Sequence, residues 1–142
     1  MGHFGKETTR IDKNDVDTIL RSNSHELERG LDPLFERIGD ARIVLLGEAS
    51  HGTHEYYLWR AIITRYLIEE KGFNIIGVKG DWPDCYRINR YIRNYENIGE
   101  KAVDVLKKFH RWPTWMWANW EISALMEWLK EYNTGRSFDK QA

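Results

Sequence analysis

The chain has 142 residues, of which 42% are hydrophobic and 13% aromatic, so its size fits one domain and its composition excludes an intrinsically disordered protein. With 21 basic and 22 acidic residues the net charge is -1, which excludes an overall attraction to nucleic acid or to an anionic membrane. No apolar run is long enough to cross a bilayer, no signal region is visible, and the single cysteine, Cys85, excludes an intrachain disulfide, so we expect a cytoplasmic protein.

The first part of the chain predicts helices followed by a strand. Residues 1–14 are polar and lack periodicity, so we expect a flexible amino terminus. Across residues 15–38 apolar side chains recur at helical spacing and predict one or two short helices, with Pro33 near the start of the last. The continuous apolar run 42–46 (RIVLL) then predicts a strand that is buried on both faces.

The next segments predict a second strand beside the first. A loop over residues 47–53 precedes an apolar pattern of helical period that ends before Gly72. The apolar run 73–78 (FNIIGV) predicts another buried strand, so the strand, helix and strand together indicate a right-handed parallel crossover. A further helix is predicted from Pro83 to about Asn94.

The rest of the chain predicts helices and a tail. Helices are expected at about 99–109 and from Asn119, a good N-cap, to about Tyr132, and residues 133–142 form a polar tail. The predicted fold class is therefore α/β, a partial parallel sheet flanked by helices. Because such a sheet needs partners at both edges, we expect residues 15–132 to be the opening portion of a larger fold. A fragment, a truncated product and an obligate oligomer that self-associates through unpaired sheet edges all fit this expectation.

Both loops that follow the predicted strands carry reactive side chains: Glu48, Ser50, His51 and His54 in the first, and Lys79, Asp81 and Asp84 in the second. Because the carboxyl ends of parallel strands share one edge, we expect these loops to converge. His51 is the natural general base, since an imidazole titrates close to neutral pH. Glu48 is close enough in sequence to orient His51 or to contact a substrate. Alternatively, Glu48 accepts hydrogen bonds from loop amides.

Two other chemistries fit the first loop less well. A nucleophile elbow has the pattern Gly-x-Ser-x-Gly, but here two residues instead of one separate Gly47 from Ser50. We therefore expect Ser50 to help cap the next helix. Glu48, His51 and His54 are possible metal ligands, but their spacing matches no zinc helix motif, and we predict no metal site.

Aromatic and basic residues further along the chain are candidates for substrate binding. Residues 109–120 contain four of the seven tryptophans, which either pack as core or form an apolar wall for a bulky substrate. Arg60 lies on a predicted helix, where an arginine either faces solvent or contacts a substrate. The candidate substrate-binding residues are Arg60, Trp115 and His54.

Three blocks, LLGEASHGTHEYYLWRAIITRYLIEEKGF, GDWPDCYRINRYIR and FHRWPTWMWANWEISALMEWL, resemble successive blocks of the erythromycin esterase family. The resemblance extends from about Asp15 to Tyr132. It implies a hydrolase without metal or other cofactor that opens a macrolide lactone ring, and hence a small-molecule ester or lactone substrate. By the same resemblance, His51 falls on the proposed general base, Glu48 on the glutamate of the same motif, and Asp81 on the aspartate of the block usually written Val-Glu-Gly-Asp.

The sequence departs from the family pattern at one position of that second block. Lys79 stands where the family has an acidic residue of the catalytic centre, and a cation there could pair with Glu48 and disfavour a protonated His51. The chain also resembles only the opening part of a family enzyme, so we expect an impaired hydrolase with an incomplete active site. The alternatives are a non-catalytic remnant or binding module, and a half-site chain that needs a partner.

Overall fold

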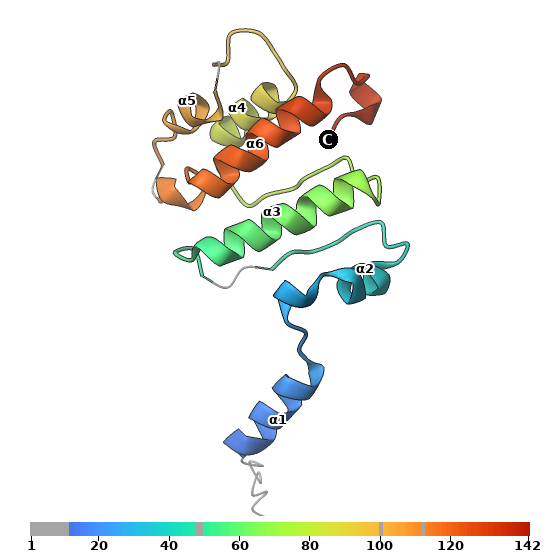
Figure 1. Ribbon diagram of the computed structural model, residues 1–142. Coiled ribbons are helices and arrows are strands. Elements are labelled where there is room, and N and C mark those ends of the chain that lie inside the picture. The colour runs from blue at the N-terminus through green and yellow to red at the C-terminus, as the bar shows by residue number, and fades with distance from the viewer. Residues whose placement is uncertain (1–11, 48–49, 100, 112) are drawn as a thin grey trace, which may run out of the picture. The chain divides into compact units, whose positions relative to one another are not determined.

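The computed structural model describes residues 12–47, 50–99, 101–111 and 113–142. The chain divides into two compact units, Met1–Val44 and Leu45–Ala142. All regular elements in the described ranges are helices, drawn as coils in Figure 1.

The amino-terminal unit contains the helices α1 (Lys13–Asn23) and α2 (Asp32–Ile38), with the 3-10 turn η1 (Leu27–Arg29) between them. The Asp12 side chain caps α1 by accepting a hydrogen bond from the Asn14 amide at 3.0 Å. No residue of α1 is buried, whereas Phe35 of α2 is only 6% exposed. The prediction of one or two short helices for this region is confirmed.

The larger unit contains α3 (His54–Glu69), α4 (Trp82–Ile92), α5 (Ala102–Leu106), α6 (Trp120–Asn133) and the 3-10 turns η2 (Thr114–Met116) and η3 (Phe138–Lys140). Local signals in the sequence explain two of the helix starts. Pro83 lies in the first turn of α4, and the Asn119 side chain accepts a hydrogen bond from the Ile122 amide at 2.9 Å. The helices predicted here are confirmed within a few residues. In the described part of the chain, no helix has the length and apolar character of a membrane span.

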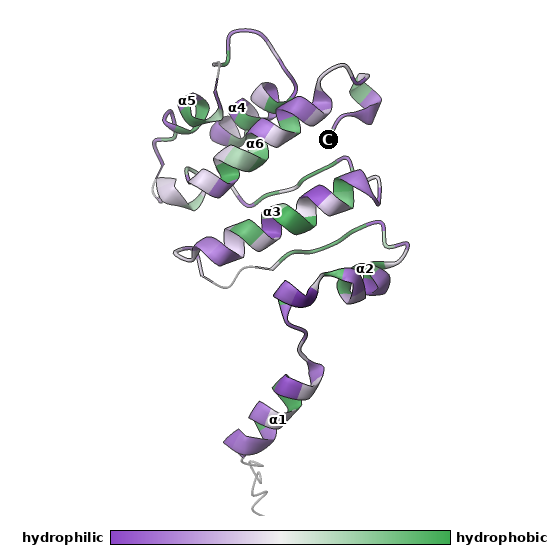
Figure 2. Cartoon of the chain, in the orientation of Figure 1, coloured by the Kyte–Doolittle hydropathy of each residue, from purple (hydrophilic) through white to green (hydrophobic). Residues whose placement is uncertain are grey.

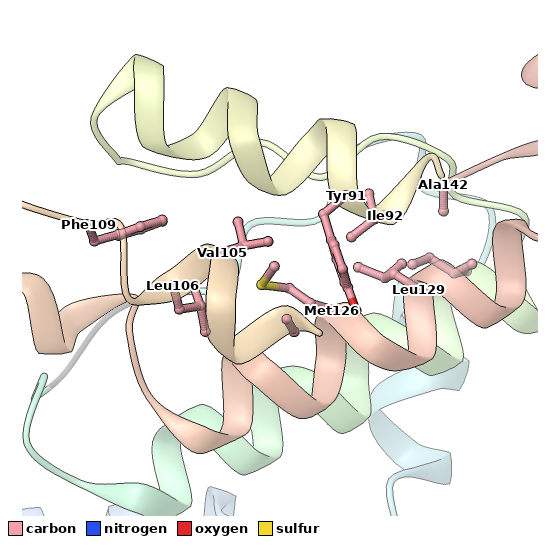
Figure 3. Close-up of a cluster of buried hydrophobic side chains, with 10 residues drawn as sticks. Tyr91, Ile92, Val105, Leu106, Phe109, Met126, Leu129 and Ala142 are labelled. Atoms are coloured by element: carbon pink, nitrogen blue, oxygen red, sulfur yellow. The ribbon is translucent and has the colours of Figure 1, made fainter. Parts of the chain in front are cut away.

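The core of this unit lies where α4, α5 and α6 meet (Figure 3). Its buried side chains come from these three helices, from α3 and from the segments that follow α5 and α6: Ile68, Tyr91, Ile92, Ala102, Val105, Leu106, Phe109, Met126, Leu129 and Ala142. α3 packs against α6. Removing these apolar side chains from water is the main free energy that holds the helices together.

A carboxylate at the edge of the core joins three helices. Glu127 of α6 accepts a hydrogen bond from the Tyr91 hydroxyl of α4 at 2.7 Å. Its second oxygen accepts one from the amide of Ala102, the first residue of α5, also at 2.7 Å. Tyr91 and Ala102 are almost completely buried, at 1% and 0% exposure, so the Glu127 carboxylate serves two donors that lie away from water.

A buried asparagine fixes the end of the chain described here. The Asn133 side chain donates to the carbonyls of Ile92 and Ala142 and accepts a hydrogen bond from the Ala142 amide, at 2.8 to 2.9 Å. Asn133 is only 1% exposed, and its polar atoms are satisfied by backbone groups. Residues 133–142, predicted as a polar tail, therefore return to the carboxyl end of α4.

The predicted α/β fold with a partial parallel sheet is wrong. No strand is assigned in the ranges that the structure describes, and the runs 42–46 and 73–78 contain neither helix nor strand (Figure 1). Figure 2 shows both runs as hydrophobic, yet Leu45 is 90% exposed and Ile75 is 83% exposed. A strand requires a neighbouring backbone as hydrogen-bond partner, and an apolar run alone does not supply one.

The Glu127 network predicts a specific loss of stability. Glu127→Ala removes the acceptor of two buried donors, and we expect it to lower the free energy of unfolding by about 1 to 3 kcal/mol. Urea unfolding followed by tryptophan fluorescence measures this change. Glu131→Ala is the matched control, an exposed acidic residue on the same helix. Equal stability of the two variants would contradict the role of Glu127.

The same network predicts how the free energy of unfolding changes at high pH. Burial, followed by the hydrogen bond and the charge of Glu127, raises the pKa of Tyr91 above its ordinary value of about 10. The unfolded chain therefore loses this proton first. The stabilising contribution is complete below about pH 10 and is lost as the pH rises further. Tyr91→Phe should flatten the decline in unfolding free energy above pH 10, whereas Tyr95→Phe, at an exposed tyrosine, should not.

Candidate functional site

His51 lies in the turn before α3 and faces the aromatic segment that precedes α6. Its ring and that of Trp115 have centroids 6.2 Å apart and are tilted by 60°. His51 is half-buried, while Trp115 is 45% exposed and so remains accessible to a ligand. The structure thus brings the predicted general base and one predicted substrate-binding residue together. Glu48, the predicted partner of His51, lies outside the described residues.

His54 is the first residue of α3, and its Nδ1 atom contacts a carboxylate oxygen of Glu121. Glu121 lies in the first turn of α6. Its side chain is only 14% exposed, compared with 60% for His54. This contact joins the starts of two helices that lie 67 residues apart in sequence.

Asp81 occupies the N-cap position of α4, where its side chain makes no capping hydrogen bond. Its carboxylate instead accepts a hydrogen bond from Arg111 at 2.8 Å. Three residues further, the buried carboxylate of Asp84 accepts one from Arg87 at 2.7 Å. The start of α4 therefore holds two carboxylates, each paired with an arginine.

The loop before α4 is fixed by close packing. The Lys79 carbonyl accepts a hydrogen bond from the Trp117 indole at 3.2 Å. At Gly80 a Cβ atom would lie 2.4 Å from the sulfur of Cys85 and 3.4 Å from the Trp117 nitrogen. Only a glycine fits there without movement of its neighbours. Burial, with the charges of Asp84 and Asp81, raises the pKa of Cys85, which disfavours the reactive thiolate form.

A cavity of about 320 Å³ opens beside this loop. Its walls include two acidic and two basic residues next to aromatic and apolar ones, among them Lys79, Asp81, Asp84, Arg111, Met116 and Trp117. Polar groups that converge on an apolar hollow are typical of small-molecule sites.

The predicted site residues do not all border this cavity. Of those that the structure describes, Asp81 lines it, whereas His51, His54, Arg60 and Trp115 do not. Arg60 lies on α3 with its guanidinium 5.3 Å from the centroid of the Tyr57 ring, a cation–π contact within the helix. In the described ranges, no group of three or more His, Cys, Asp or Glu residues is arranged to hold a metal ion.

Sequence reasoning missed Glu121 and the role of Arg111. Glu121 is an acidic residue in the first turn of a capped helix, where a carboxylate usually interacts with the helix dipole. Arg111 lies in a loop and carries no pattern of its own. Neither residue has a signal that connects it to His54 or Asp81, because both contacts are long-range.

Comparison with known proteins assigns the chain to a family. The sequence model of the family described as erythromycin esterase matches residues 68–141, more than half of the chain. The chain belongs to the erythromycin esterase family. The matched range includes Asp81, Trp115 and Glu121, and it begins after His51 and His54.

Two curated relatives from Escherichia coli agree with this assignment. Erythromycin esterase type II is 33% identical over 101 residues, which are 71% of this chain and 22% of the relative. Erythromycin esterase type I is 30% identical over 95 residues, 67% of this chain and 21% of the relative. The chain thus spans about a fifth of the length of these relatives. No solved structure shows significant similarity to it.

The close packing at Gly80 predicts a severe effect of adding one methyl group. Gly80→Ala should destabilise the protein by about 1 to 3 kcal/mol, because the new Cβ overlaps the Cys85 sulfur. Adding Cys85→Ala removes the sulfur and should recover part of the loss. Urea unfolding of the single and double variants measures both changes. Gly77→Ala is the control, since a Cβ there meets no heavy atom within 4 Å. A Gly80→Ala variant as stable as this control would refute the packing argument.

Proposed function

We propose that this chain supplies the general base of an ester hydrolase, with His51 activating water for attack on an ester or lactone carbonyl. Two findings support the proposal. The chain belongs to the erythromycin esterase family, and His51 lies beside an accessible tryptophan ring. The second is the observation that carries it, because an imidazole next to an apolar wall can receive an activated water and a bulky substrate together.

In this reaction the His51 imidazole removes a proton from water. The water oxygen attacks the carbonyl carbon, whose double-bond electrons move to the carbonyl oxygen. When the carbonyl reforms, the bond to the alcohol oxygen breaks and an acid and an alcohol result. A lactone gives both groups on one opened chain. Trp115 provides a surface against which the apolar part of the substrate packs.

The other candidate residues take supporting roles in the proposal. Glu48 orients His51. Asp81 is the acidic group of the second loop, and its contact with Arg111 fixes its carboxylate at the cavity beside Lys79. Arg60 and His54 contact the substrate from α3. A macrolide lactone is the proposed substrate class because two relatives carry the name erythromycin esterase.

A second candidate function is binding without hydrolysis. Lys79 favours it, because this lysine borders the cavity in place of the family's acidic residue and has no ion pair among the described residues. A cation at this position suits recognition of an anionic or carbonyl group better than activation of water. Ligand binding without turnover is the expected result for this alternative.

Substitution of His51 tests the hydrolase proposal. We expect His51→Ala to lower kcat/KM for p-nitrophenyl esters and for a macrolide lactone by about 10²- to 10⁴-fold, the usual contribution of a positioned base. The measurement is release of p-nitrophenol and, for the macrolide, mass spectrometry of the opened ring. His110→Ala is the matched control, an exposed histidine in the loop before η2. Unchanged kcat/KM in His51→Ala would exclude His51 as the base, and absence of turnover by the unmodified protein would leave binding as the function.

A further inference from the structure

The contact between His54 and Glu121 has the geometry of an acid–base pair. The Nδ1 atom of His54 faces the carboxylate, so the proton between them lies on Nδ1 and the second ring nitrogen, Nε2, points away from Glu121. The His54 side chain is 60% exposed, and its ring is therefore open to a ligand. A histidine held by a carboxylate through one nitrogen exchanges protons through the other.

Glu121 is held more firmly than a surface carboxylate. Asn119, two residues before it, caps α6 through its Oδ1 atom and donates from Nδ2 to the carbonyls of Trp115 and Met116, both at 3.3 Å. These bonds join η2 to the start of α6. The Glu121 side chain is also 14% exposed, so the protein covers most of it. Its position is thus set before any substrate binds.

One segment, residues 115–121, contacts His51, in the turn before α3, and His54, the first residue of α3. Trp115 faces His51, and Glu121 contacts His54. The two imidazoles are three residues apart in sequence and meet the same segment. Ester hydrolysis needs two proton transfers, one from water and one to the departing alcohol. Two histidines held in this way suit the two transfers.

We propose that His54 is the general acid that protonates the leaving alcohol and that Glu121 is its positioning residue. This inference rests on the proposed hydrolase function. His51 takes a proton from water as the water oxygen bonds to the carbonyl carbon. The bond to the alcohol oxygen then breaks, its electron pair goes to that oxygen, and the oxygen takes the proton from Nε2 of His54. His51 releases its proton to solvent and His54 regains one, so the cycle closes.

The competing explanation is a structural one, in which the contact only ties α3 to α6. The two explanations predict different effects of the ester's leaving group on the activity that a variant loses. An alkoxide leaves poorly unless it is protonated, whereas a p-nitrophenolate spreads its charge over the ring and leaves unaided. Loss of a general acid therefore affects alkyl esters selectively, and loss of a structural tie affects all esters alike.

The test compares ethyl butyrate with p-nitrophenyl butyrate, two esters of one acid, in the unmodified protein and in His54→Gln, Glu121→Gln and Glu121→Ala. We expect His54→Gln to lower kcat/KM for the ethyl ester by about 10²-fold or more, and for the p-nitrophenyl ester by less than about fivefold. Glu121→Ala should show the same selectivity with a smaller loss, and Glu121→Gln a smaller loss still, because its amide oxygen can accept the Nδ1 proton. Glu131→Ala is the control on the same helix.

Chemical rescue separates the two explanations a second time. Imidazole added to His54→Ala should restore hydrolysis of the ethyl ester, because a free imidazolium can protonate the alkoxide but cannot tie two helices together. Equal losses on both esters, or no loss on either, would overturn the role of His54 and leave the proposed function intact. If the unmodified protein hydrolyses neither ester and no macrolide, both the proposed function and this inference are wrong.

Discussion

The carboxylate of Glu127 is the polar interaction that connects the three helices around the apolar core of the larger unit. It binds the buried Tyr91 hydroxyl and the buried Ala102 amide, and so connects α6 to both α4 and α5 at the point where the apolar side chains meet. Burying such donors without a partner would oppose the gain from the apolar core. Because α6 is held here, its two ends are also fixed. Its start carries Glu121, and its last residue, Asn133, holds the end of α4.

The helices were predictable because their signals are local. Pro83 and Asn119 mark helix starts by their own chemistry, and the apolar period of α3 is visible within a single window of sequence. The runs 42–46 and 73–78 gave an equally clear apolar signal and a wrong fold class. Burial of a strand depends on a second backbone that the run itself does not specify, and these runs remain unpaired in the described structure with Leu45 and Ile75 exposed.

In the candidate site, too, local features could be predicted from the sequence and long-range contacts could not. His51 could be proposed as a base from its residue type and its place in a glycine-containing loop, and Trp115 became a candidate because tryptophans are dense in its segment. The structure shows that the two rings are neighbours. The partners of His54 and Asp81 were not predictable. Glu121 and Arg111 lie 67 and 30 residues away from them, and the contacts arise only when α3, α4 and α6 have assembled. The sequence thus shows which side chains can carry out a reaction, but their partners become known only from contacts between distant parts of the chain.

In the loop before α4, the contacts that fix the backbone do not involve the charged side chain of Lys79. The Lys79 carbonyl is held by Trp117, and Gly80 is held against Cys85, so neither constraint involves the lysine side chain. An acidic residue at this position would leave the same backbone contacts in place. A change of charge at this position therefore leaves the packing of the loop backbone unaffected. In the reaction that we propose, both proton transfers are assigned to His51 and His54, which do not line the cavity that Lys79 borders.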